Sequence, residues 1–210
     1  MKIPMKKIIL LLLCIVLGVT TSYAKERPKE SYENYVKGYE KVLKGWKKEF
    51  KKMPRTGDVT IDFLEILTKH HKGTLAMIEN ELAYGDNPVI WQFARGIKNT
   101  QYKRKSQIEL LIKQLKKEKQ ADKETEKIYL GEAQKIIQNM LQQMEKTDCK
   151  ENVDKAYVLQ MIISHEATNQ LAEHIMKYSN NATVQEIAQK MVNTQTKEIK
   201  KMQKFAREIR

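Results

Sequence analysis

The sequence repeats itself at an offset of 94 residues, and this repeat restricts the possible folds more than any other feature. Identical residue types coincide at this offset without a gap: His71 with His165, Thr74 with Thr168, Glu79 with Glu173, Tyr84 with Tyr178, and 99–101 with 193–195. A register shared over about 85 residues indicates duplication of one helical unit. Neither unit is expected to bury its apolar face alone. The repeat therefore predicts that the two units, about 30–115 and 124–209, pack around a pseudo-twofold axis into one bundle.

Apolar residues recur at helical spacing along both units, and no stretch alternates as a β-strand does. Six helical segments are expected, at 31–53, 59–84, 88–118, 122–146, 152–179 and 182–209. Asp58 and Asn87 are suited to cap the second and third segments, and Pro88 occupies a tolerated first helical position. The fold class predicted from these patterns is all-α, with the segments 59–84 and 152–179 central and antiparallel or crossing near His71 and His165.

The first 24 residues have the pattern of a signal peptide. Lys2, Lys6 and Lys7 precede an apolar run at 8–19, and 22–24 offers small residues where a signal peptidase reads. The run of about twelve residues is shorter than the roughly 20 that span a bilayer. We therefore expect cleavage after Ala24, a single helical domain at 25–210, no transmembrane segment after cleavage, and a periplasmic or secreted location. A lipoprotein signal at Cys14 is the alternative.

The chain is strongly basic, with 39 Lys and Arg against 26 Asp and Glu, and a formal charge of +13. Such a charge favours anionic partners, but export argues against nucleic acid. Many lysines also stand near helix ends, where they complement the helix dipole. We expect no nucleic-acid partner and a loose association with anionic envelope surfaces. Cys149, the only cysteine after residue 24, is either an incidental thiol or a crosslinking or metal-binding residue.

Two of the four histidines occupy the same position in the two units. His71 and His165 continue the apolar rows of their segments and should face the core, where the pseudo-axis would bring them together. Met161 precedes His165 by one turn, and Met77 lies two turns after His70 on the same face. Imidazole with thioether suits copper, especially the reduced ion. The alternative is that these are ordinary core residues, since methionine commonly fills helical cores.

The histidine segments resemble a known family. The segment 67–77 is similar to the signature of the domain of unknown function 305 family, and 161–167 resembles a second copy. The segments 93–101 and 187–202 resemble the partner helix that follows each copy. This resemblance implies a ferritin-like helical bundle of a family that is typically exported and that includes members associated with copper binding through His and Met. Leu67, Ser164 and Leu171 replace the leading Met, the first His and the trailing Met of those signatures.

The ligands that survive these replacements define the candidate metal site. They are His70, His71, Met77, Met161 and His165. His174 matches no family position and is expected on the surface.

Other chemistry lacks its sequence signals. No Glu-x-x-His motif of a di-iron bundle occurs, nor a phosphate-binding loop, nor a Gly-x-Ser-x-Gly elbow. We assign no catalytic residue, no organic cofactor and no enzymatic activity. Two hypotheses for function stay open at this point. The first is an exported, non-catalytic protein that binds or buffers copper. The second is a helical interaction module of the cell envelope with a degenerate metal site.

Overall fold

The computed structural model describes residues 29–118, 121–147 and 152–209, and every element in this part of the chain is a helix or a connection between helices. Six α-helices follow in order: α1 (Lys29–Phe50), α2 (Val59–Tyr84), α3 (Pro88–Leu115), α4 (Lys123–Glu145), α5 (Val153–Ile175) and α6 (Ala182–Glu208). The all-α prediction is confirmed. The predicted signal peptide, Cys14 and Cys149 lie outside the described residues.

Side-chain caps fix where the helices begin. Asp58 accepts hydrogen bonds from the N–H groups of Thr60 and Ile61 at the start of α2, and Asn87 caps α3 in the same way ahead of Pro88. Both caps were predicted from sequence. Each supplies an acceptor to N–H groups that have no partner within the helix.

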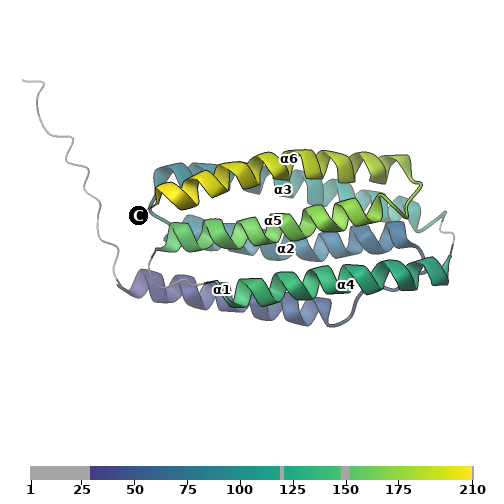
Figure 1. Ribbon diagram of the computed structural model, residues 1–210, viewed down its shortest axis with the longest axis horizontal. Coiled ribbons are helices and arrows are strands. Elements are labelled where there is room, and N and C mark those ends of the chain that lie inside the picture. The colour runs from purple at the N-terminus through teal and green to yellow at the C-terminus, as the bar shows by residue number, and fades with distance from the viewer. Residues whose placement is uncertain (1–28, 119–120, 148–151, 210) are drawn as a thin grey trace, which may run out of the picture.

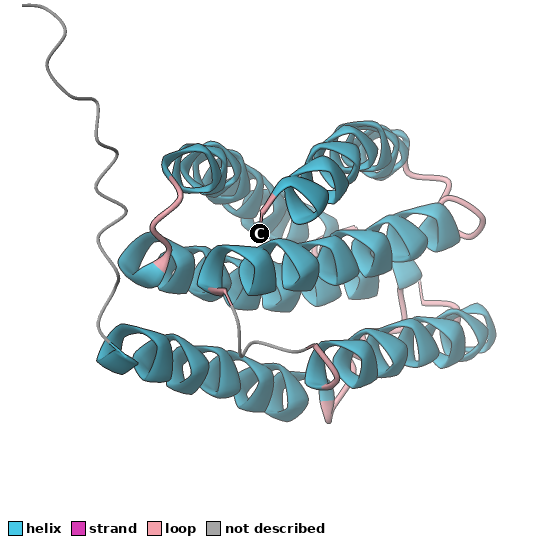
Figure 2. Ribbon diagram, turned by 60° about the vertical axis from the view of Figure 1, so that its left-hand side comes forward, coloured by secondary structure: helices cyan, strands magenta, loops and turns pink. Residues whose placement is uncertain are grey.

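The helices form three layers of two (Figures 1 and 2). α2 and α5 make the middle layer and pack against each other, with α1 and α4 on one side and α3 and α6 on the other. α3 and α6 diverge from one another along their length (Figure 2). They meet at one end, where the rings of Phe93 and Phe205 are 5.4 Å apart.

The middle layer is tied to the hairpin turns at both ends. The carboxylate of Asp154, at the start of α5, accepts hydrogen bonds from the N–H groups of Asp86 and Asn87 in the α2–α3 turn. At the other end, Thr60 and Ser179 share a hydrogen bond of 2.8 Å, which joins the start of α2 to the α5–α6 turn. These bonds fix α2 and α5 lengthwise, so the residues at their middles face each other in one register.

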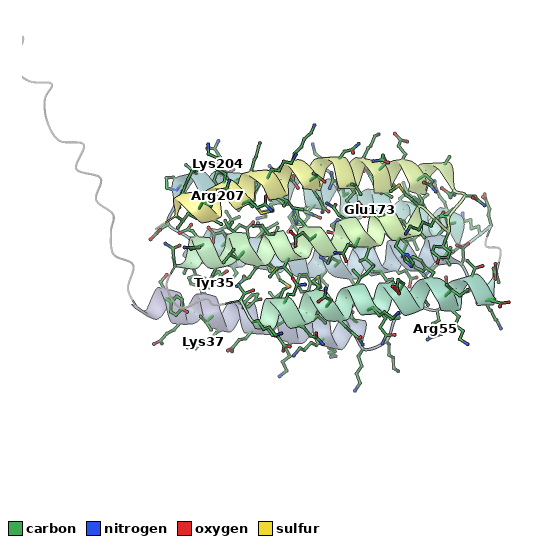
Figure 3. The ribbon with its side chains drawn as sticks, viewed as in Figure 1. Tyr35, Lys37, Arg55, Glu173, Lys204 and Arg207 are labelled. Carbon is green, nitrogen blue, oxygen red and sulfur yellow. The ribbon has the colours of Figure 1, made fainter. Side chains whose placement is uncertain are left out.

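The aromatic residues of α1 belong to the core, as predicted. Tyr35, Tyr39 and Trp46 are all buried. The Tyr35 hydroxyl donates to Gln160 on α5, and that of Tyr39 donates to the carbonyl of Met144 on α4. Long cationic side chains such as Lys37 and Lys204 lie on the outside of the bundle (Figure 3). Within the described residues, no helix is both long enough and apolar enough to cross a membrane.

Candidate functional site

The histidines of α2 and α5 come together where these two central helices meet. His70, His71 and His165 are all at most 2% exposed. The rings of His70 and His71 are 6.4 Å apart, and the Ser164 hydroxyl lies 3.0 Å from Nε2 of His70, which joins α2 directly to α5. The two helices are antiparallel, since the start of each lies beside the end of the other, and they meet next to His71 and His165.

Both ring nitrogens of His70 have hydroxyl partners. Nε2 pairs with Ser164 at 3.0 Å and Nδ1 with Thr74 at 3.2 Å, while the ring stacks on Trp46 at 5.2 Å. Burial lowers the pKa of His70 well below its usual 6.5, and the nearby rings of His71 and His165 lower it further. His70 is thus a neutral imidazole held in place by two hydroxyl groups and an indole.

His71 is a neutral imidazole with an unpaired nitrogen. Burial, followed by the positive charge of Arg104 on α3, lowers its pKa to about 4. The Leu67 carbonyl and the Gln101 side chain oppose this shift, but Nδ1 is buried without a hydrogen bond of good geometry. In the neutral ring one of the two nitrogens carries no proton, and such a nitrogen can act as a ligand without competition from protons.

His165 is oriented by a carboxylate that comes from α6. Its Nε2 lies 3.0 Å from a carboxylate oxygen of Glu198, which is 18% exposed. A carboxylate can only accept from the ring, so this bond places a proton on Nε2, and in the neutral form of the ring the lone pair is on Nδ1. That Nδ1 is buried and has no partner. Carboxylates hold metal-binding histidines in this way in many metal sites.

The two methionines are buried in the same core as the histidines. Met77 is 2% exposed and Met161 is fully buried. Met161 lies one turn before His165 on α5, so its thioether belongs to the same region of the helix. Met77 lies two turns beyond His70, an advance of about 10.5 Å along α2. Of the two sulfur atoms, that of Met161 therefore belongs more closely to the histidine cluster.

The expectation that His174 lies on the surface is wrong. It is 7% exposed, its ring stacks on Tyr129 of α4 at 4.9 Å, and its Nε2 lies 3.2 Å from the Tyr129 carbonyl. Burial lowers its pKa. The physical reason is that α5 is a central helix, so its face toward α4 is covered as well as its face toward α2.

The residues that support the histidines come from α3 and α6, and none of them was among the predicted site residues. Gln101 and Arg104 act on His71, while Glu198 bonds His165 and Gln195 accepts from Thr168. The repeat contained a usable signal, because Gln101 coincides with Gln195 at the same offset as the histidines.

A surface groove reaches Glu198, the hydrogen-bond partner of His165. It lies between α3 and α6, has a volume of about 670 Å³, and is lined by Phe93, Ile97, Glu198, Lys201 and Phe205 among others. Glu198 therefore belongs both to the groove and to the hydrogen bond with His165. In the described part of the chain, His, Cys, Asp and Glu side chains form no group of three or more that could hold a metal ion. Metal binding here would depend on imidazole together with thioether groups.

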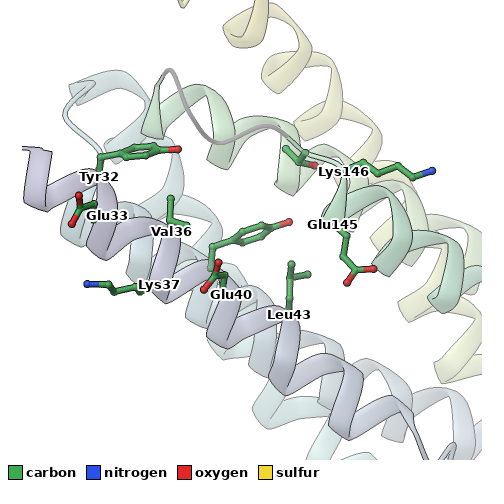
Figure 4. Close-up of a pocket in the computed structure, with 10 residues that line it drawn as sticks. Tyr32, Glu33, Val36, Lys37, Glu40, Leu43, Glu145 and Lys146 are labelled. Carbon is green, nitrogen blue, oxygen red and sulfur yellow. The ribbon is translucent and has the colours of Figure 1, made fainter.

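A second hollow, of about 920 Å³, lies between the start of α1 and the end of α4 (Figure 4). Its rim is charged and mixed, with Lys37, Glu40 and Glu145 around Val36 and Leu43. It contains none of the candidate metal ligands.

One family model matches the chain. The model described as Domain of unknown function (DUF305) matches residues 45–111 and, in a second match, residues 60–206. No match was found among curated proteins or among solved structures.

Proposed function

This chain belongs to the domain of unknown function (DUF305) family, and from that premise and the histidine cluster we propose that it is an exported, non-catalytic protein that binds or buffers copper. Export rests on the signal-peptide pattern of residues 1–24 and implies a periplasmic or secreted location. We also infer a ferritin-like bundle of two repeated three-helix units. The repeat offset, and the packing of α2 with α3 and of α5 with α6, support this inference.

The observation that carries the copper proposal is the presence of two buried histidine ring nitrogens without a hydrogen-bond partner. Nδ1 of His71 and Nδ1 of His165 are both buried and unpaired, and Glu198 fixes the His165 tautomer that presents a lone pair. Two buried imidazoles with a thioether nearby, from Met161, are a donor set that fits the soft cuprous ion. His70 and Met77 are the other two residues of the proposed copper site. His70 acts through its hydrogen bonds, because both of its nitrogens already have partners.

When bound, copper would supply only its affinity for nitrogen and sulfur ligands. The protein's own contribution is to keep His70 and His71 neutral by burial and to orient His165 through Glu198. A lowered histidine pKa removes proton competition at neutral pH.

The test is anaerobic titration of the mature protein with cuprous ion against a coloured chelator. The variant carries His71→Ala with His165→Ala, and the matched control is His174→Ala, which removes a buried histidine bonded to Tyr129 instead. We expect the parent and the control to withdraw copper from the chelator and the double variant to lose this ability, with its helical content retained. A parent that binds no copper, or a double variant that binds as the parent does, would reject the proposal.

The second candidate is a helical interaction module of the envelope. It is favoured by α3, which carries four of the five exposed large apolar residues of the described chain: Val89, Trp91, Tyr102 and Leu110. Exposed apolar groups are typical of protein contact surfaces. In that case, Trp91→Ala with Tyr102→Ala should abolish a crosslink to an envelope protein in cells without changing copper binding. Exposed lysines would add a loose, salt-sensitive association with anionic envelope surfaces.

A further inference from the structure

The groove between α1 and α2 has the size and shape of a ligand site. Its volume is about 500 Å³, which is within the usual range for small-molecule pockets. Small residues line it: Gly38, Gly45, Gly73, Ala76 and Ala83. On the α1 side it extends from Gly38 to Glu49, eleven residues, or about 16 Å along the helix axis. The groove is therefore long and narrow.

Two glycines show which part of this groove is filled and which part is open. A Cβ atom on Gly73 would lie 2.0 Å from the Trp46 indole, so the indole occupies that space. A Cβ atom on Gly45 would meet nothing within 4 Å. The space beside Gly45 is thus available to a ligand, and Trp46 is one of the residues that line it.

Trp46 has an unsatisfied polar group at the groove. The side chain is only 2% exposed, yet its Nε1–H has no hydrogen-bond partner. Leaving a buried donor unpaired costs about 1–3 kcal/mol. A ligand with an oxygen acceptor would satisfy this donor, which a purely apolar ligand would not.

The charges at the rim favour an anion. Of the two carboxylates that line the groove, Glu49 pairs with Lys72 at 3.0 Å and Glu79 pairs with Lys98 at 2.7 Å. Lys69 donates only to backbone carbonyls. Lys41 is exposed and forms no ion pair in the described part of the chain. Two lysine charges therefore remain without a directly paired carboxylate.

We propose that this groove binds a single-chain amphipathic anion, such as a fatty acid. The long apolar trough accommodates an extended acyl chain, and the ligand's carboxylate is held by Lys41 and by the indole N–H of Trp46. The Trp46 indole stacks on His70, so the groove borders the histidine cluster, but the proposal does not rest on copper binding.

The probe is dodecanoate, and the reporter is Trp46. The chain has two tryptophans, so Trp91→Phe leaves Trp46 as the only one. Titration of this variant of the full chain with a brominated dodecanoate should quench its fluorescence saturably. Gly45→Leu fills the open space and should abolish quenching. The control is Gly131→Leu, also at a helical glycine with open space, which should leave the affinity unchanged.

A charge variant tests the anionic end of the ligand. Lys41→Glu should weaken dodecanoate binding about five-fold, as expected for loss of a rim charge worth about 1 kcal/mol, and should leave the affinity for dodecanol unchanged. Absence of saturable quenching would overturn the proposal. So would unchanged binding in Gly45→Leu, or equal affinity for dodecanol and dodecanoate in the parent.

Discussion

Close packing of α1 on α2 makes Gly73 the most sensitive small residue in this interface. In Gly73→Ala, the new methyl group would lie 2.0 Å from Nε1 and 2.1 Å from Cε2 of Trp46. Trp46 cannot move away freely, because it is buried and its ring stacks on His70 at 5.2 Å. Overpacking of this kind costs about 1–3 kcal/mol, whereas replacing a helical glycine by alanine contributes about 1 kcal/mol.

The net expectation for Gly73→Ala is a loss of up to about 2 kcal/mol of unfolding free energy, or a melting temperature lowered by up to about 8 °C. The assay is thermal and urea unfolding followed by circular dichroism at pH 7. Gly45→Ala is the matched control, because its methyl group would meet nothing within 4 Å, and it should be stabilised by about 0.5–1 kcal/mol. If the two variants were equally stable, the close contact between Gly73 and Trp46 would be wrong.

Three further predictions concern buried polar groups. The pKa values of His70 and His71 are lowered from 6.5 in the folded protein, so their contribution to the stability of the fold is fully present above pH 6.5. Urea unfolding should show this contribution lost as the pH falls toward 4, by about 3 kcal/mol for His71. Asp62 behaves oppositely, because burial raises its pKa from 3.8 to about 6: its contribution is present below pH 3.8 and lost as the pH rises through 6. Asp62→Asn should therefore raise the unfolding free energy by up to about 3 kcal/mol at pH 7.5 and by little at pH 3.5; an equal effect at both pH values would contradict this. Ser164→Ala should cost about 1–3 kcal/mol in the same assay, because it leaves Nε2 of His70 buried without a partner, while the exposed Ser106→Ala should cost little.

Much of the fold could be predicted from sequence because its determinants are local or periodic. The helix starts at Asp58 and Asn87 follow from capping chemistry, which needs only the adjacent residues. The central position of α2 and α5 followed from the repeat and from their apolar character. Helix ends were less accurate, since α5 ends at Ile175 and not at 179. Its last turn has no residue that stops a helix sharply.

Only the histidines and methionines of the candidate site could be predicted from the sequence, and the residues that surround them could not. Helical spacing placed His71 and His165 in the core, and both are buried there. The roles of Arg104 and Glu198 depend on how α3 and α6 lie over the middle layer. This packing of helices against one another cannot be predicted from the spacing of residues in a single sequence. The burial of His174 was missed for the same reason. Its environment is made by Tyr129 of α4, 45 residues away in the chain.

The copper proposal is tested most directly by the ¹⁵N chemical shifts of the histidine side chains at pH 7, before and after one equivalent of cuprous ion. This ion is diamagnetic, so the resonances remain observable. We expect the Nδ1 resonances of His71 and His165 to move, because these are the buried unpaired nitrogens. The Nε2 resonance of His70 should not move, because this nitrogen keeps its hydrogen bond with Ser164. Unchanged Nδ1 resonances of His71 and His165 in the presence of copper would contradict the proposed site.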